Sequence, residues 1–180
     1  SKRILGKDIR DFCGKPMLAY SIEAALASQL FSEVMVSTDS RQIAQLAVSY
    51  GAKVPFMRSE ETAGDYATIA EVMMEVLGEY EKRGRTFDVF ACIYATAPFV
   101  TAEKLRMAMD LLQKEDCYGV LPVVRFSFPP QRAYEITEGN ELRYLWEAHS
   151  ESRSQDLEPL YHDAGQFSFY RVQKYMQDHG

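Results

Sequence analysis

The first residues of the chain concentrate positive charge. Lys2, Arg3 and Lys7 lie within the first seven residues, whereas the whole chain of 180 residues has a formal net charge of -6. Ammonium and guanidinium groups complement phosphate oxygens, and backbone amides that precede a helix add further donors. A local cationic site on an acidic chain favours a small polyanion over a nucleic-acid duplex as the ligand. The alternative is a solvated basic loop at the surface.

Other candidate ligand-binding segments lie where an extended run gives way to a helix, because ligands collect at such places in open α/β sheets. With residues 1–7, these segments are 38–40, 58–65 and 95–98. Asp39 and Gln42 have the spacing of a capping box, so a helix cap explains Asp39 without a ligand. Thr68 and Glu71 have the same spacing and predict that a helix begins there, and Thr101 is expected to cap the next helix.

The elements that must position these segments follow from hydrophobic periodicity. Helical spacing of apolar residues predicts helices over 16–28, 42–50, 68–82, 101–112 and 172–176. Apolar and β-branched runs predict strands over 33–37, 53–56, 89–94, 119–124 and 166–170. This alternation predicts one layered α/β domain over residues 1–180 with a mostly parallel sheet. The run 89–94 is apolar throughout, as in a central strand that is covered on both faces.

The alternation of predicted helices and strands stops after residue 125. Apolar residues alternate on both sides of Glu138-Gly139-Asn140, which predicts a β-ribbon between Tyr134 and Tyr144. We therefore expect an insertion over 126–160 that holds this ribbon and a polar loop. The ribbon is expected to be an inserted flap or a dimerisation arm, and its aromatic content is compatible with the second because aromatic residues are enriched in interface cores.

Composition narrows the class of protein. With 47% hydrophobic and 26% charged residues, the chain is typical of globular proteins. No apolar run reaches the eighteen or so residues of a membrane span. Cys13, Cys92 and Cys117 are odd in number and widely spaced, which fits neither a disulfide framework nor a zinc site. A cytoplasmic location without a membrane segment is expected.

Several motifs, in order along the chain, resemble the CMP-sialic acid synthetase family. Residues 1–9 and 12–17 are similar to the family's opening motif ARGGSKxIPxKNI, with Leu5 in place of its Pro and Asp8 in place of its Asn. Ser37-Thr38-Asp39 and Arg58 also match. The segments that resemble the pseudaminic acid branch of the family are 92–99, 131–133, 153–157 and 161–167. The resemblance runs to about Phe169 and implies a three-layer, Rossmann-like nucleotide-diphospho-sugar transferase fold.

The resemblance implies a cytidylyltransferase that acts as a homodimer on CTP and an acidic nine-carbon sugar. The anomeric hydroxyl of the sugar would attack the α-phosphorus of CTP, giving a CMP-sugar and diphosphate with Mg²⁺ as cofactor. Pseudaminic acid is the expected sugar, for glycosylation of the cell surface or flagellin, and N-acetylneuraminate or a related acid is the alternative. The resemblance places a first strand before Ser1 and the metal ligands in an acidic segment beyond Gly180, so no metal residue is assigned here. A non-catalytic nucleotide-binding or assembly module is the alternative of another class.

Site residues follow from the matched motifs. Lys2 and Lys7 are the expected catalytic residues, in contact with the triphosphate. The other expected nucleotide-binding residues are Arg3, Asp8, Arg58, Thr68, Tyr94 and Thr96. The expected sugar-binding residues are Gln131, Arg132, Arg153, Gln155, Asp163 and Gln166. An arginine suits the sugar's carboxylate because it can donate two parallel hydrogen bonds. In the alternative interpretation, Arg132 only supports the ribbon and Asp163 only caps a turn.

Overall fold

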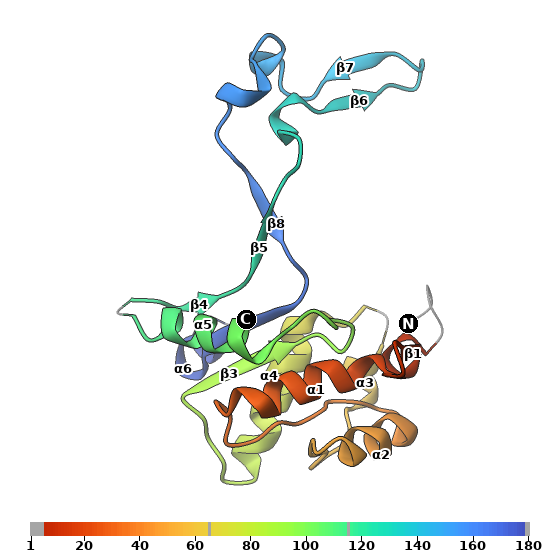
Figure 1. The fold of residues 1–180 in the computed structure, drawn as a ribbon, viewed down its shortest axis with the longest axis vertical. Coiled ribbons are helices and arrows are strands. Elements are labelled where there is room, and N and C mark those ends of the chain that lie inside the picture. Colours follow the sequence, from red (N-terminus) through yellow and green to blue (C-terminus); the bar gives the residue numbers. More distant parts are fainter. Residues whose placement is uncertain (1–5, 65, 115, 179–180) are drawn as a thin grey trace. The chain divides into compact units, whose positions relative to one another are not determined.

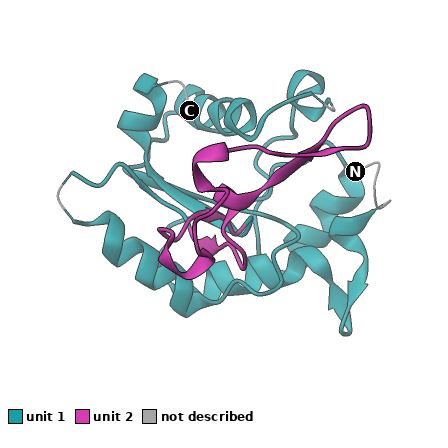
Figure 2. Cartoon of the chain, turned by 90° about the horizontal axis from the view of Figure 1, so that it is seen from above, with its two compact units in different colours: residues 1–121, 165–180 teal, residues 122–164 magenta. Residues whose placement is uncertain are grey.

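The computed structural model describes residues 6–64, 66–114 and 116–178 (Figure 1). The expectations for Lys2 and Arg3 therefore lie outside the described residues. The chain divides into two compact units, residues 1–121 with 165–180 and residues 122–164 (Figure 2). The insertion expected over 126–160 falls inside the range of the second unit.

The helices of the first unit agree with the helical spacing of the sequence. They are α1 Met17–Ser28, α2 Arg41–Ser49, α3 Glu60–Ala63, α4 Ile69–Lys82, α5 Ala102–Leu112 and α6 Val172–Asp178. Helix α1 begins directly after Pro16, and Gln29 ends it with a left-handed φ of 59°. The short α3, which was not among the expected helices, lies within the candidate ligand-binding segment 58–65.

Two helix caps agree with the predictions from the sequence, and a third differs from its prediction. The capping box of Thr68 and Glu71 is present at the start of α4. Thr101 caps α5 by accepting a hydrogen bond from the Lys104 amide. The expected cap at Asp39 is wrong, because the hydroxyl of Ser40 caps α2 instead. Thr38 Oγ1 accepts the Ser40 amide at 3.1 Å, which sets Ser40 as the residue that precedes the helix.

The sheet of the first unit has the order β3-β9-β4, with β3 Val89–Ile93, β9 Phe167–Arg171 and β4 Gly119–Val120. β9 is antiparallel to both of its neighbours, with Val89 opposite Arg171 and Ile93 opposite Phe167. Parallel pairing among the described residues is an isolated bridge between Met35 and Lys53. The expectation of a mostly parallel sheet is therefore not confirmed, since the returning strand β9 runs between the two strands it joins. A helix-covered sheet of the α/β class is confirmed.

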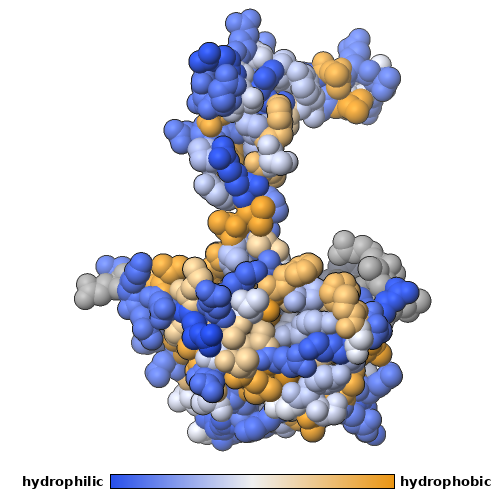
Figure 3. Space-filling model, in the orientation of Figure 1, coloured by the Kyte–Doolittle hydropathy of each residue, from blue (hydrophilic) through white to orange (hydrophobic). Residues whose placement is uncertain are grey.

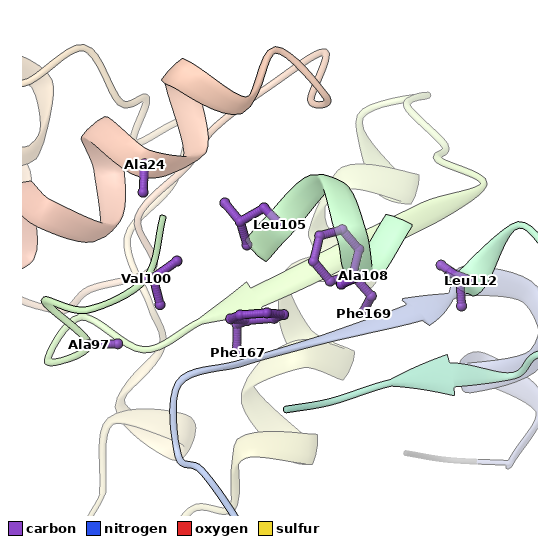
Figure 4. Close-up of a cluster of buried hydrophobic side chains, with 8 residues drawn as sticks. All are labelled: Ala24, Ala97, Val100, Leu105, Ala108, Leu112, Phe167 and Phe169. Carbon is purple, nitrogen blue, oxygen red and sulfur yellow. The ribbon is translucent and has the colours of Figure 1, made fainter. Parts of the chain in front are cut away.

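A cluster of buried apolar side chains joins α5 to the sheet (Figure 4). Phe167 and Phe169 of β9 are both buried, as alternate residues on one face of a strand should be. Phe169 and Leu105 of α5 are 0% exposed. Ala97 and Val100, from the turn after β3, belong to the same cluster. The core therefore holds the C-terminal end of β3 and its turn in place.

The second unit is built from two short ribbons. β5 Val123–Arg125 pairs with β8 Tyr161–Asp163, and β6 Tyr134–Ile136 pairs with β7 Leu142–Tyr144, both antiparallel. The β6–β7 ribbon confirms the alternation in the sequence around residues 138–140. The expected single strand over 119–124 is wrong, because the run divides at Leu121-Pro122 into β4 and β5 of different sheets.

Apolar side chains of the β6–β7 ribbon remain uncovered. Ile136 and Leu142, which face each other across it, are 71% and 68% exposed. Figure 3 shows hydrophobic side chains at the surface of this ribbon. In the described part of the chain, no helix is long and apolar enough to cross a membrane.

Candidate active site

Arg58 is the most firmly held of the expected nucleotide-binding residues. Its Nε donates to Ser37 Oγ at 3.0 Å and its Nη2 donates to the Ser37 carbonyl at 2.7 Å. Its own amide donates to the carbonyl of Thr38, a buried residue, at 2.9 Å. Among the described residues, no hydrogen bond or ion pair occupies Nη1. Arg58 therefore keeps a fixed positive charge and a free donor on a half-buried side chain.

The same guanidinium lies near the C-terminal half of β3. Burial raises the pKa of the Cys92 thiol to about 11, and the positive charge of Arg58 opposes part of this rise. At neutral pH the thiol is protonated and is a poor nucleophile. The end of the 34–37 segment, the start of 58–64 and the end of β3 therefore meet around Arg58.

The turn after β3 is fixed by bonds to two distant segments. The Tyr94 amide donates to the Gln166 carbonyl at 2.9 Å, and the Tyr94 carbonyl accepts Ser21 Oγ of α1 at 2.7 Å. Thr96 lies within this turn and is half-buried. The structure thus brings together Tyr94, Thr96 and Gln166, which the sequence analysis assigned to the nucleotide and the sugar.

Gln166 carries an unsatisfied acceptor. Its Oε1 is buried, and none of the described residues forms a hydrogen bond with it. Buried polar atoms without a partner are rare in proteins because they cost free energy, and they mark places where a ligand or water can donate. This oxygen belongs to the residue that binds the Tyr94 amide through its backbone, so a ligand at this turn could reach it.

Lys7 and Asp8 belong to the 3₁₀ turn Lys7–Ile9, which follows Gly6 with its left-handed φ of 60°. The Ile9 amide donates to the Gly6 carbonyl at 3.1 Å. The Ile9 side chain packs on the cluster of Leu18 and Ile22 from α1. The turn is therefore anchored by its last residue, and no described residue forms an ion pair with Lys7.

Thr68 has a structural role that needs no ligand. Its hydroxyl donates to Glu71 Oε2 at 2.9 Å and accepts the Glu71 amide at 3.2 Å. The Glu71 carboxylate also accepts the Thr68 amide at 2.6 Å. These bonds account for Thr68 as the cap of α4, and its contact with a nucleotide stays a prediction.

In the second unit, Gln131 and Arg132 combine local bonds with unsatisfied groups. Gln131 Nε2 donates to the Glu158 carbonyl at 2.9 Å, and Arg132 Nη2 donates to the Tyr144 hydroxyl at 3.5 Å. Gln131 Oε1 and Arg132 Nε are buried, and neither has a hydrogen-bond partner in the part of the chain that the structure describes. One turn of this unit therefore offers an unused acceptor and an unused charged donor on adjacent residues.

The other expected sugar-binding residues of this unit are less concentrated. Arg153 forms an exposed ion pair with Asp156, with Nε and Oδ2 2.6 Å apart. Gln155 lines a pocket of about 430 Å³ together with Arg125 and Phe128. Asp163 is exposed on β8, opposite Val123. Their roles in sugar binding stay predictions.

Sequence reasoning missed the residues that support Arg58. Glu75 accepts hydrogen bonds from Ser59 and Thr62, and Ser37 accepts those of Arg58. Ser59 caps α3, which its spacing from Thr62 could have indicated. Glu75 lies between Met74 and Val76, one helical turn from both Glu71 and Glu79, and nothing in the local sequence distinguishes it from these two glutamates.

The helices and the sheet of the first unit give the chain a fold of the α/β class. The same fold occurs in a CMP:2-keto-3-deoxy-manno-octonic acid synthetase solved in complex with CTP, with a TM-score of 0.71 and 18% identity. That likeness covers 99% of this chain and 72% of the other.

The chain belongs to the cytidylyltransferase family, whose model matches residues 1–179. It is 38% identical over 178 residues to the pseudaminic acid cytidylyltransferase of Campylobacter jejuni, covering 99% of this chain and 77% of the relative. It is 34% identical over 146 residues to the N-acylneuraminate cytidylyltransferase of Escherichia coli, covering 81% of this chain and 34% of the relative. The family resemblance of the opening, central and C-terminal motifs is thereby confirmed.

Proposed function

We propose that the protein transfers CMP from CTP to pseudaminic acid, giving CMP-pseudaminic acid and diphosphate. The observation that carries this proposal is the 38% identity, over nearly the whole chain, with a relative named for that activity. The turn after β3 supports it, because Tyr94 and Thr96 place polar groups where a strand of the sheet ends. Arg58 adds a positive charge that is held in place by Ser37.

In the proposed reaction, the anomeric hydroxyl of the sugar attacks the α-phosphorus of CTP. A bond forms between that oxygen and the phosphorus, the bond to the bridging oxygen breaks, and diphosphate leaves. Such reactions depend on positioning and on neutralising charge on phosphate oxygens. We assign the neutralisation of phosphate charge to Lys7, together with Lys2 and Arg3, and the last two lie outside the described residues. The other residues proposed to contact the nucleotide are Asp8, Arg58, Thr68, Tyr94 and Thr96.

We assign the acid sugar to Gln131, Arg132 and Gln166 first. Each has a buried atom that no described residue pairs with: an acceptor on Gln166 in the first unit, and an acceptor and a charged donor on Gln131 and Arg132 in the second. A carboxylate suits the guanidinium, while hydroxyl and amide groups of a sugar suit the two carbonyl oxygens. Arg153, Gln155 and Asp163 are proposed as further contacts.

The proposed cofactor is Mg²⁺. No group of three or more His, Cys, Asp or Glu residues in the described part of the chain could hold a metal ion. The described residues therefore do not fit a metal site. We further propose that the protein is cytoplasmic and that it forms a homodimer. The exposed apolar residues Ile136 and Leu142 of the β6–β7 ribbon support the homodimer.

The test is diphosphate release with CTP and pseudaminic acid, each also omitted in turn. Release only with both substrates is expected. Equal turnover with N-acetylneuraminate would favour the alternative that the Escherichia coli relative supports. CTP binding without turnover of any acid sugar would favour a non-catalytic nucleotide-binding module.

A further inference from the structure

The carboxylate of Glu75, on the second turn of α4, gathers three hydrogen-bond donors from the segment that follows Arg58. Oε1 accepts the Ser59 amide at 2.8 Å, and Oε2 accepts the Ser59 hydroxyl at 3.0 Å. Oε2 also accepts the hydroxyl of Thr62, a residue only 9% exposed. One carboxylate therefore fixes both the backbone and the hydroxyls of this segment.

These bonds form the second of two anchors on residues 58–62. The first anchor is Arg58, which binds Ser37 and Thr38 at the end of the preceding extended segment. The second anchor begins at the next residue, Ser59, and leads to α4. Since the Arg58 guanidinium extends from a backbone held on both sides, a loss of the Glu75 bonds should displace it.

The charge of Glu75 matters as well as its shape. Burial by itself would raise the pKa of Glu75, but hydrogen bonds from Thr62 and Ser59 and the charge of Arg58 lower it overall. The group is therefore an ionised acceptor, and it can accept from all three donors at once. A glutamine has a single acceptor oxygen and would place an NH₂ group against two hydroxyls.

We infer that Glu75 is a positioning residue for nucleotide binding, which acts through Ser59 and Thr62 to hold Arg58 in its binding geometry. This inference rests on the proposed function only in that CTP is the ligand of Arg58. Glu75 itself makes no contact with the nucleotide in this account.

The test is the affinity for CTP, measured by titration calorimetry on the full chain and on the variant Glu75→Gln. Loss of charge-assisted hydrogen bonds should weaken CTP binding about three- to tenfold. The matched control is Glu79→Gln, one turn further along α4, where the carboxylate pairs only with Lys82 and Arg83 at the surface. The control should bind CTP like the unaltered protein.

A second variant and a double variant separate positioning from folding. Thr62→Val removes one donor to Glu75 and should weaken CTP binding about two- to threefold. In an Arg58→Ala background, Glu75→Gln should have no further effect, because its effect passes through Arg58. Loss of general folding would instead add to the effect of Arg58→Ala.

The outcomes distinguish this inference from the proposed function. If Arg58→Ala weakens CTP binding while Glu75→Gln and Thr62→Val do not, the positioning role is overturned and the proposed function stands. If Arg58→Ala leaves CTP affinity unchanged, the assignment of Arg58 to the nucleotide is wrong and the inference falls with it. If the unaltered protein does not bind CTP, the proposed function itself is wrong.

Discussion

Arg58 binds Ser37 twice, through the hydroxyl at 3.0 Å and through the backbone carbonyl at 2.7 Å. These two residues are 21 positions apart in sequence, so the contact depends on how the extended segment 34–37 meets the loop before α3. The planar guanidinium suits this forked arrangement, and a lysine could not reproduce it. The relationship gives the proposed nucleotide site a fixed positive charge.

Arg58→Lys should therefore weaken CTP binding by about tenfold although it keeps the charge, because the ammonium cannot make both bonds to Ser37. Titration calorimetry with CTP measures the effect. The matched control is Arg106→Lys, since Arg106 also binds backbone carbonyls, those of Ala27 and Ser28, away from this segment. Equal affinities of Arg58→Lys and the unaltered protein would contradict the assignment.

The stability of the first unit should depend on pH through Glu33, whose side chain is 3% exposed. Burial alone would raise its pKa, but hydrogen bonds from Tyr80, Arg85 and Lys53 outweigh this and lower it to about 2, from an ordinary 4.5. A lowered pKa means stability that is present above pH 4.5 and is lost as the pH falls towards 2.

Glu33→Gln should remove part of this dependence and cost about 1–3 kcal/mol of unfolding free energy at neutral pH. Urea denaturation between pH 2 and 7 measures both effects, and the exposed Glu81→Gln serves as the control. Parallel stability curves for Glu33→Gln and the unaltered protein would show that the Glu33 cluster does not contribute as described.

Local sequence signals predicted much of the fold. The Thr68 capping box, the Thr101 cap and the ribbon between Tyr134 and Tyr144 each depend on residues within a few positions or one short turn of each other. Such signals act before any tertiary contact forms, so they can be recognised without the rest of the chain.

Features that depend on distant pairing were not predicted. Strand β9 pairs with β3, where Val89 lies opposite Arg171, and its other edge pairs with β4. Nothing in the sequence near Val89 or Arg171 indicates that these strands are antiparallel. In the candidate site, the motifs indicated Arg58 and Tyr94. They did not indicate Glu75, whose partner Ser59 lies 16 residues away on another element.

Thr68→Ala should lower the unfolding free energy by about 1 kcal/mol, because it removes the cap of α4. Thr68→Ser keeps the hydroxyl and should restore most of this loss. Chemical denaturation measures the effect, and CTP titration of the same variants tests whether Thr68 also contacts the nucleotide. An unchanged unfolding midpoint in Thr68→Ala would contradict the capping role.

Arg132→Ala should raise KM for the acid sugar about tenfold or more and leave KM for CTP unchanged, because the arginine is assigned to the sugar's carboxylate. The matched control is Arg143→Ala on the same ribbon, where the arginine is 71% exposed and pairs with Glu135. Steady-state kinetics with each substrate varied in turn separates the two constants. If both variants behave alike, Arg132 only supports the ribbon.

The central claim is that this chain joins CMP to pseudaminic acid. The most direct measurement is ³¹P NMR of separate reactions that contain the protein, pseudaminic acid, Mg²⁺ and one nucleotide, which is CTP, UTP or ATP. We predict that a CMP-sugar phosphodiester and diphosphate appear together and in equal amounts, and only in the reaction that contains CTP as the nucleotide. Diphosphate release with CTP but without the sugar, or equal product from UTP or ATP, would contradict it.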